Sequence, residues 1–109
     1  MTAFAVLTGA TFRLYAVDGD SMEPHLRPGQ IILVNRLAYA LRAPRIGDIV
    51  AFYAESEKEA VVKRITRFHE DGYLELHGDN SRVSIDSRQY GPVSQIRLIG
   101  RVIFVGRNR

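Results

Sequence analysis

The run Ala60-Val61-Val62-Lys63-Arg64-Ile65 constrains the fold most, because its β-branched residues predict a buried strand that carries a lysine. Lysine is rare here: only Lys58 and Lys63 stand among the 15 basic residues. Arginine cannot release its proton in a protein, whereas a desolvated lysine can become neutral and act as a base. The run therefore predicts a strand that buries an amine with a chemical role.

The alternation of a regular strand places Lys63 between Val61 and Ile65 on one face, with Val62 and Arg64 on the other. Aliphatic neighbours desolvate the amine, which lowers the expected pKa of Lys63 and makes the free base accessible near neutral pH. The alternative is that Lys63 extends to the edge of the sheet and has no role.

Short strands separated by turn residues make up most of the rest of the chain. Helix is scarce: one turn after Ser21 and the segment 37–41. The segment 30–35 is expected to be buried on both faces, and 70–72 to connect a hairpin. This pattern predicts one all-β domain over residues 1–109, a compact coiled antiparallel β-barrel. The expected strands are 11–17, 30–35, 48–54, 60–69, 73–77 and 98–105.

The composition is that of an ordinary globular protein, with 46% hydrophobic and 25% charged residues. Because cysteine is absent, disulfides and thiolate zinc sites are excluded. A net charge of +3 suits a weakly anionic partner such as a lipid surface, so peripheral membrane contact is one expectation. No apolar run approaches the ~20 residues of a membrane span. As it stands the chain is expected to be soluble or cytoplasmic, and membrane-associated if an anchor is missing or supplied by a partner.

Ser21 is the candidate hydroxyl for Lys63, because it lies in the turn-rich segment 17–24 and a neutral amine can activate serine without histidine. The alternative is a helix N-cap, and such a cap also directs backbone N–H groups at a developing oxyanion. The three histidines compete poorly as catalytic or metal-binding groups, since they lack the spacing of known motifs; we expect His25, His69 and His77 at the surface or the barrel edge.

Several segments in order resemble the conserved boxes of the signal peptidase I family, the Ser-Lys dyad serine peptidases. Residues 19–29 resemble the nucleophile box, 47–50 a structural box and 62–65 the general-base box. Residues 78–80, 84–88 and 91–93 resemble the box that braces the dyad. The resemblance covers roughly residues 15 to 103. It implies a β-barrel of the signal peptidase and self-cleaving repressor type, with Ser21 as nucleophile, Lys63 as general base and no cofactor or metal.

The same resemblance implies roles for the residues around the dyad. Ser84 would bond the Lys63 amine, and an ion pair between Asp86 and Arg88 would hold the loop in place. Asp79 and Asn80 belong to the same supporting box. Taken alone, this segment would be an ordinary cluster of polar turns.

The resemblance also implies an oxyanion site and a substrate cleft. The Ser21 amide is the expected oxyanion donor, and Gly19 occupies the position where many family members carry a second donor hydroxyl, which is missing here. The cleft would hold small residues one and three positions before the scissile bond. The expected substrate-binding residues are Met22, Leu26, Ile31 and Val50.

The leading prediction is a short soluble serine endopeptidase that removes signal or leader peptides from precursor polypeptides after small residues. One specific option is maturation of nickel superoxide dismutase precursors. A second is a self-cleaving repressor-type peptidase, although no helix-turn-helix or cleavable linker is apparent. A third is a non-catalytic basic β-barrel that binds another molecule. Nucleic acid is not expected as a partner, because Phe52, Tyr53 and Phe68 are scattered and form no stacking face.

Overall fold

The computed structural model describes residues 2–8, 11–54 and 60–106, and within them the fold is almost entirely β. The strands form one antiparallel sheet in the order β1-β2-β3-β7-β4-β5-β6, and β1 also pairs with β5. The prediction of an all-β antiparallel fold is confirmed. The elements are β1 (Thr2–Thr8), β2 (Phe12–Asp18), β3 (Ile31–Asn35), α1 (Ala38–Leu41), β4 (Ile49–Tyr53), β5 (Ala60–Phe68), β6 (Leu74–His77), α2 (Ser87–Tyr90), the 3₁₀ turn η1 (Gln95–Arg97) and β7 (Leu98–Val105).

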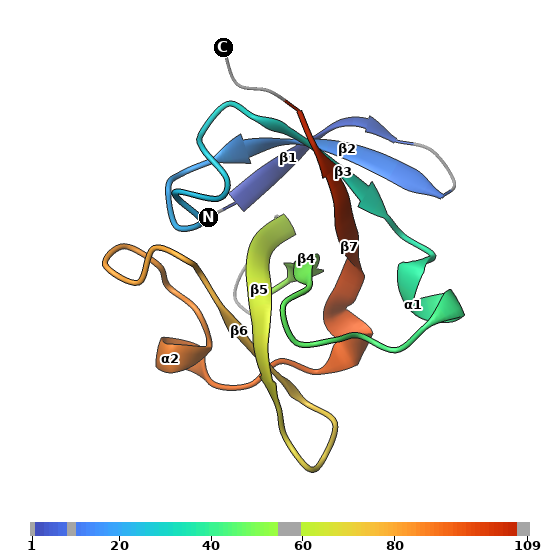
Figure 1. Cartoon of the computed structure of the whole chain (residues 1–109), viewed down its shortest axis with the longest axis vertical. Helices are drawn as coiled ribbons and strands as arrows, with labels where there is room; N and C mark the ends of the chain where they lie inside the picture. The colour runs from blue at the N-terminus through green and yellow to red at the C-terminus, as the bar shows by residue number, and fades with distance from the viewer. Residues whose placement is uncertain (1, 9–10, 55–59, 107–109) are drawn as a thin grey trace.

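The sheet is strongly coiled. In Figure 1, β1, β2 and β3 lie across the upper part of the view, and β5 and β6 run through the lower part. β7 crosses the upper strands and runs down to the right of β5. The β1–β5 pairing joins Thr2 to Val61 and Ala3 to Ala60, so the first strand lies between β2 and β5. These are the two strands that lead to Ser21 and carry Lys63.

Two apolar clusters form the core, and β4 and β5 contribute to both because their side chains alternate. Ala60 and Val62 of β5 belong to the first cluster, whereas Val61 and Ile65 belong to the second. This agrees with the expected faces of β5, and Lys63 lies in register on the Val61 and Ile65 face. Core packing on both faces of β5 therefore determines the register of this strand and the direction of the Lys63 side chain.

The expected strand boundaries are close to those observed, with three differences. β1 was not expected, because its strand conformation depends on pairing with distant β2 and β5 rather than on a local pattern. The segment before Asn35 is not buried on both faces: Ile32 and Val34 are buried, whereas Ile31 is 37% exposed. The short helix α2 also lies in a segment expected to be an irregular turn cluster.

Among the described residues, no helix has the length and apolarity that crossing a membrane would require.

Candidate active site

The loop after β2 carries Ser21, and its buried side chains anchor it in the core. Gly19 adopts a φ of +85°, a left-handed conformation that favours glycine. Met22 and Leu26 are fully buried in the first apolar cluster, and the Leu26 amide donates to the Met22 carbonyl at 2.9 Å. The Ser21 side chain thus has a defined position at the end of β2, with a residue exposure of 3%.

Lys63 meets Ser21 from the facing strand. It lies in the middle of β5, pairs with Val50 of β4, and is 0% exposed. Its Nζ lies 2.9 Å from Ser21 Oγ and 3.1 Å from Ser84 Oγ. The two residues predicted as a pair from the sequence are therefore in hydrogen-bond contact, and Ser84 contacts the amine as expected.

Asp86 determines the direction of these hydrogen bonds. A carboxylate only accepts, so the Ser84 hydroxyl donates to Asp86 Oδ2, at 2.5 Å. With its proton committed to Asp86, Ser84 Oγ can only accept from Lys63 Nζ. One N–H of the amine therefore points to Ser84, and Nζ also contacts Ser21 Oγ.

Asp86 stays ionised although it is buried. Burial alone would raise its pKa, but donors surround the carboxylate: Arg88 Nε at 2.9 Å, the Ser84 hydroxyl, and the Gly78 amide at 2.7 Å. Together these donors outweigh desolvation and hold the pKa of Asp86 well below its usual range. The expected Asp86–Arg88 ion pair is present.

Gly78 lies at the point where the two halves of the site meet. A Cβ at this position would lie 2.2 Å from Ser84 Oγ and 2.7 Å from the Ser21 carbonyl oxygen. Both distances are shorter than any real contact of a Cβ, so only glycine allows Ser84 and the Ser21 loop to come this close. The sequence identified the Gly-Asp-Asn box but gave no signal for this steric requirement.

Asp79 and Asn80 tie the two loops together. The Asn80 amide donates to the Ser21 carbonyl at 2.7 Å, and Asn80 Nδ2 donates to the Asp20 carbonyl at 3.1 Å. Asp79 accepts from Arg64 Nε at 2.8 Å and Nη2 at 2.9 Å. Arg64, which follows Lys63 on β5, thereby attaches this loop to the lysine strand.

The expected substrate-binding residues lie in different parts of the fold. Met22 and Leu26 belong to the first apolar cluster, whereas Val50 is fully buried in the second. Ile31 lies on the opposite face of β3 from Ile32, which packs in the first cluster. Met22 and Leu26 therefore share a cluster, whereas Val50 lies opposite Lys63 in the register of β4 and β5.

Sequence reasoning missed two residues near the site. Ser87, given no role, is buried, and its Oγ accepts from the Leu76 amide at 2.9 Å, which fastens α2 to β6. Gln89 completes a reciprocal capping box with Asp86 at the start of α2. The spacing Asp86-x-x-Gln89 was a sequence signal for this helix start.

The histidines lie apart from the dyad. His25 is exposed, and His69 and His77 contact Glu75 on the β5–β6 hairpin at 2.9 and 3.2 Å. The His69 and His77 hydrogen bonds hold the pKa of Glu75 below its usual value. Within residues 2–8, 11–54 and 60–106, no group of histidine and carboxylate side chains is arranged to hold a metal ion.

Known proteins resemble this chain over most of its length. The family model described as signal peptidase, peptidase S26, matches residues 1–67, a range that includes Ser21 and Lys63. A signal peptidase I of Bacillus caldolyticus is 42% identical over 66 residues, which cover 56% of this chain and 36% of that protein. Mitochondrial inner membrane protease subunit 1 of Schizosaccharomyces pombe is 31% identical over 112 residues, covering 84% and 71%. The mouse (Mus musculus) subunit 1 is 29% identical over 107 residues, covering 80% and 64%.

The chain belongs to the signal peptidase family, peptidase S26. The aligned part spans 36% of the Bacillus protein and 64% of the mouse protein.

Proposed function

We propose that this chain is a serine endopeptidase that removes signal or leader peptides from precursor polypeptides, cutting after small residues. Ser21 would be the nucleophile and Lys63 the general base. The observation that supports this proposal most strongly is the 2.9 Å contact between Lys63 Nζ and Ser21 Oγ, because the lysine is 0% exposed. Desolvation of this kind favours the neutral amine that a general base must be.

In the first half of the reaction, the neutral Lys63 amine takes the Ser21 proton as Ser21 Oγ attacks the scissile carbonyl carbon. The tetrahedral oxyanion would be stabilised by backbone N–H groups, the Ser21 amide among them. Collapse of this intermediate breaks the C–N bond, and the Lys63 ammonium gives its proton to the departing amine. The product of this half is an ester between Ser21 and the new carboxyl end of the leader.

In the second half, the same neutral amine takes a proton from water, which attacks the ester carbonyl and releases the leader. Lys63 then returns the proton to Ser21 Oγ. Ser84 acts as a positioning residue in both halves, because its Oγ accepts from Lys63 Nζ at 3.1 Å and keeps the amine directed at Ser21. The ionised Asp86 keeps the Ser84 hydroxyl in this accepting orientation.

The test is cleavage of a peptide with an Ala-x-Ala sequence before the scissile bond, followed by mass spectrometry of the products. We expect the parent to cut after the second alanine, and Ser21→Ala and Lys63→Arg to be folded but inactive. Arginine keeps the positive charge but cannot supply a neutral base. Lys58→Arg is the matched control, since Lys58 is the only other lysine of the chain.

Cleavage that survives in Lys63→Arg would refute the dyad assignment. Cleavage that survives in Ser21→Ala would refute the serine mechanism. A substrate with leucine in place of the second alanine tests the small-residue preference, and equal cleavage of both peptides would contradict it.

A further inference from the structure

The backbone N–H of Ser21, the proposed oxyanion donor, belongs to a peptide group in the loop after β2. Ser21 is 3% exposed, and within the described part of the chain its N–H donates to no acceptor. The side chains of Gly19 and Asp20 carry no hydrogen-bond donor at neutral pH, so backbone N–H groups are the donors that this segment offers to an oxyanion beside the nucleophile. The direction of the Ser21 N–H is therefore important for the proposed reaction.

The peptide group between Asp20 and Ser21 determines this direction. In a planar trans peptide, the carbonyl of one residue and the N–H of the next point in opposite directions. A hydrogen bond that anchors the Asp20 carbonyl therefore also orients the Ser21 N–H. This carbonyl accepts from the Glu23 amide at 3.1 Å, within the same turn. It also accepts from Asn80 Nδ2 at 3.1 Å, across 60 positions of the sequence.

Asn80 also contacts the other side of Ser21. Its backbone N–H donates to the Ser21 carbonyl at 2.7 Å, and its carbonyl accepts from the Ser84 amide at 3.1 Å. The peptide groups before and after Ser21 are thus both bonded to Asn80. The bonds to Ser21 and Ser84 use backbone atoms of Asn80, whereas the bond to the Asp20 carbonyl uses its side chain. A change of side chain at position 80 therefore removes the bond to Asp20 and keeps the backbone donor and acceptor.

We propose that Asn80 is a positioning residue for the oxyanion site. Its side chain fixes the Asp20–Ser21 peptide group so that the Ser21 N–H points at the oxygen of the scissile carbonyl. A donor at the carbonyl end of a peptide group also polarises it and strengthens its N–H as a donor. This role rests on the proposed function, because it takes effect when Ser21 Oγ has attacked and the carbonyl oxygen carries negative charge.

Steady-state cleavage of the Ala-x-Ala peptide by Asn80→Ala is the first measurement. We expect kcat to fall about tenfold, which is the effect of about one neutral hydrogen bond, while KM stays unchanged. Asn80→Asp has nearly the same shape but places an acceptor against the Asp20 carbonyl, so its kcat should fall at least as far. Thermal melts check that both variants are folded.

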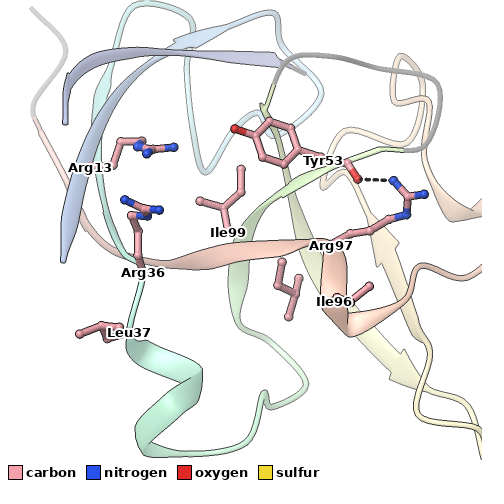
Figure 2. A pocket seen from close by; sticks show the side chains of 8 residues that line it. Arg13, Arg36, Leu37, Tyr53, Ile96, Arg97 and Ile99 are labelled. Carbon is pink, nitrogen blue, oxygen red and sulfur yellow. Dashed lines mark hydrogen bonds between the residues drawn. The ribbon is translucent and has the colours of Figure 1, made fainter. Parts of the chain in front are cut away.

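Two controls each remove a side-chain bond to a backbone carbonyl outside the Ser21 and Ser84 loops. Gln95 Nε2 donates to the Gly72 carbonyl at 2.7 Å, which makes Gln95→Ala the matched amide control. Arg97 Nη1 donates to the Tyr53 carbonyl at 3.5 Å, beside a cavity of about 570 Å³ (Figure 2). Gln95→Ala and Arg97→Ala should keep the kcat of the parent.

A pair of ligands separates oxyanion stabilisation from a general loosening of the loop. Calorimetry with the full chain compares two Ala-x-Ala peptides, one ending in an aldehyde and the other in the corresponding alcohol. Ser21 Oγ bonds to the aldehyde carbon and its proton passes to Lys63, while the carbonyl electron pair moves onto oxygen and forms the oxyanion. The alcohol cannot form this adduct. Asn80→Ala should weaken aldehyde binding about tenfold and leave alcohol binding unchanged.

A lower kcat at constant KM, together with a selective loss of aldehyde binding, supports the role of Asn80. Equal weakening of both ligands, or a kcat within a few-fold of the parent in Asn80→Ala and Asn80→Asp, would overturn it even where Ser21→Ala and Lys63→Arg are inactive. Full cleavage by Ser21→Ala, or a parent that binds the aldehyde no more tightly than the alcohol, would overturn the proposed function and this role together.

Discussion

The Asp86→Asn substitution tests whether the direction of the hydrogen bonds at the dyad matters. In the parent, the ionised Asp86 accepts the Ser84 proton, and Ser84 Oγ therefore accepts from Lys63 Nζ. An asparagine has the same shape, but only one of its two terminal atoms can accept. When the amide nitrogen of the asparagine faces Ser84, the Ser84 hydroxyl loses its acceptor and must donate to another group. The other hydrogen-bond partner of Ser84 Oγ is Lys63 Nζ, at 3.1 Å, and the lone pair of the neutral amine can accept this proton. That is the electron pair that the proposed activation of Ser21 requires.

The effect on stability follows from the same contacts. Breaking a buried ion pair costs about 3–5 kcal/mol. The Arg88 side chain is 34% exposed, so water compensates for part of the loss, and we expect about 2–3 kcal/mol. For a domain of this size the melting temperature should fall by about 10–20 °C. The effect on kcat is separate from this loss of stability, and we expect a fall of about 100-fold or more, because the lone pair of the proposed general base is engaged with Ser84.

The assay is a double-mutant cycle with Ser84→Ala, measured as kcat on the Ala-x-Ala peptide at a temperature where all four proteins are folded. Ser84→Ala removes one acceptor of the amine but leaves its lone pair free, so its kcat should fall less than that of Asp86→Asn. In the Ser84→Ala background, Asp86→Asn should then lower stability with little further loss of kcat. Thermal melts of each variant separate the two effects.

Two results would refute the reasoning. If Asp86→Asn keeps kcat within a few-fold of the parent, the direction of the Ser84 hydrogen bond is irrelevant to catalysis. If the two substitutions lower kcat independently, so that their effects add in free energy, Asp86 does not act through Ser84.

Three other expectations follow from the site. Gly78→Ala should abolish most of the cleavage and destabilise the fold by about 1–3 kcal/mol, since its Cβ would overlap Ser84 and the Ser21 carbonyl; unchanged kcat would contradict the close approach. Because the folded pKa of Asp86 is below its unfolded value, its contribution to stability is present above about pH 4 and is lost as the pH falls further. The melting-temperature difference between parent and Asp86→Asn should therefore shrink in acid, and a constant difference would argue against the linkage. Deletion of residues 2–8 should raise kcat/KM for an extended peptide, because β1 occupies edges of β2 and β5 beside the dyad; a folded but slower protein would show that β1 does not compete with substrate.

Much of the candidate site could be predicted from the sequence, because each of its parts has a local pattern. The position of Lys63 within a β-branched run predicts both its burial and the face it shares with Val61 and Ile65. The turn residues around Ser21 and the polar groups from Ser84 to Arg88 identify the two loops that must meet it. The contacts among Ser21, Lys63, Ser84 and Asp86 confirm that these segments come together.

The parts that could not be predicted depend on contacts between segments far apart in the chain. β1 is a strand only because β2 and β5 offer edges to it, and no alternation in residues 2–8 indicates this. β3 is buried on only one face, because the core lies on one side of this strand. The sequence does not indicate which face that is, since Ile31 and Ile32 are the same residue type. The requirement for glycine at position 78 arises from the approach of Ser21 and Ser84, which belong to two other segments.

Lysine at position 63 and the arginines of the ion pairs meet different chemical requirements. Arginine is the chain's ordinary cation, and within the described residues it forms the ion pairs of Asp48, Asp79 and Asp86. Each of these sites requires a charge that is permanent and a planar donor group that holds a carboxylate from two sides. Position 63 differs: Lys63 Nζ contacts the neutral hydroxyls of Ser21 and Ser84, in a place with no solvent exposure. Burial penalises a permanent charge there, whereas an amine can release its proton and avoid that penalty. Lys63→Arg should therefore lower stability as well as activity, and Lys63→Met, which removes the charge but keeps a long apolar chain, should be inactive yet more stable than Lys63→Arg when their melting temperatures are compared.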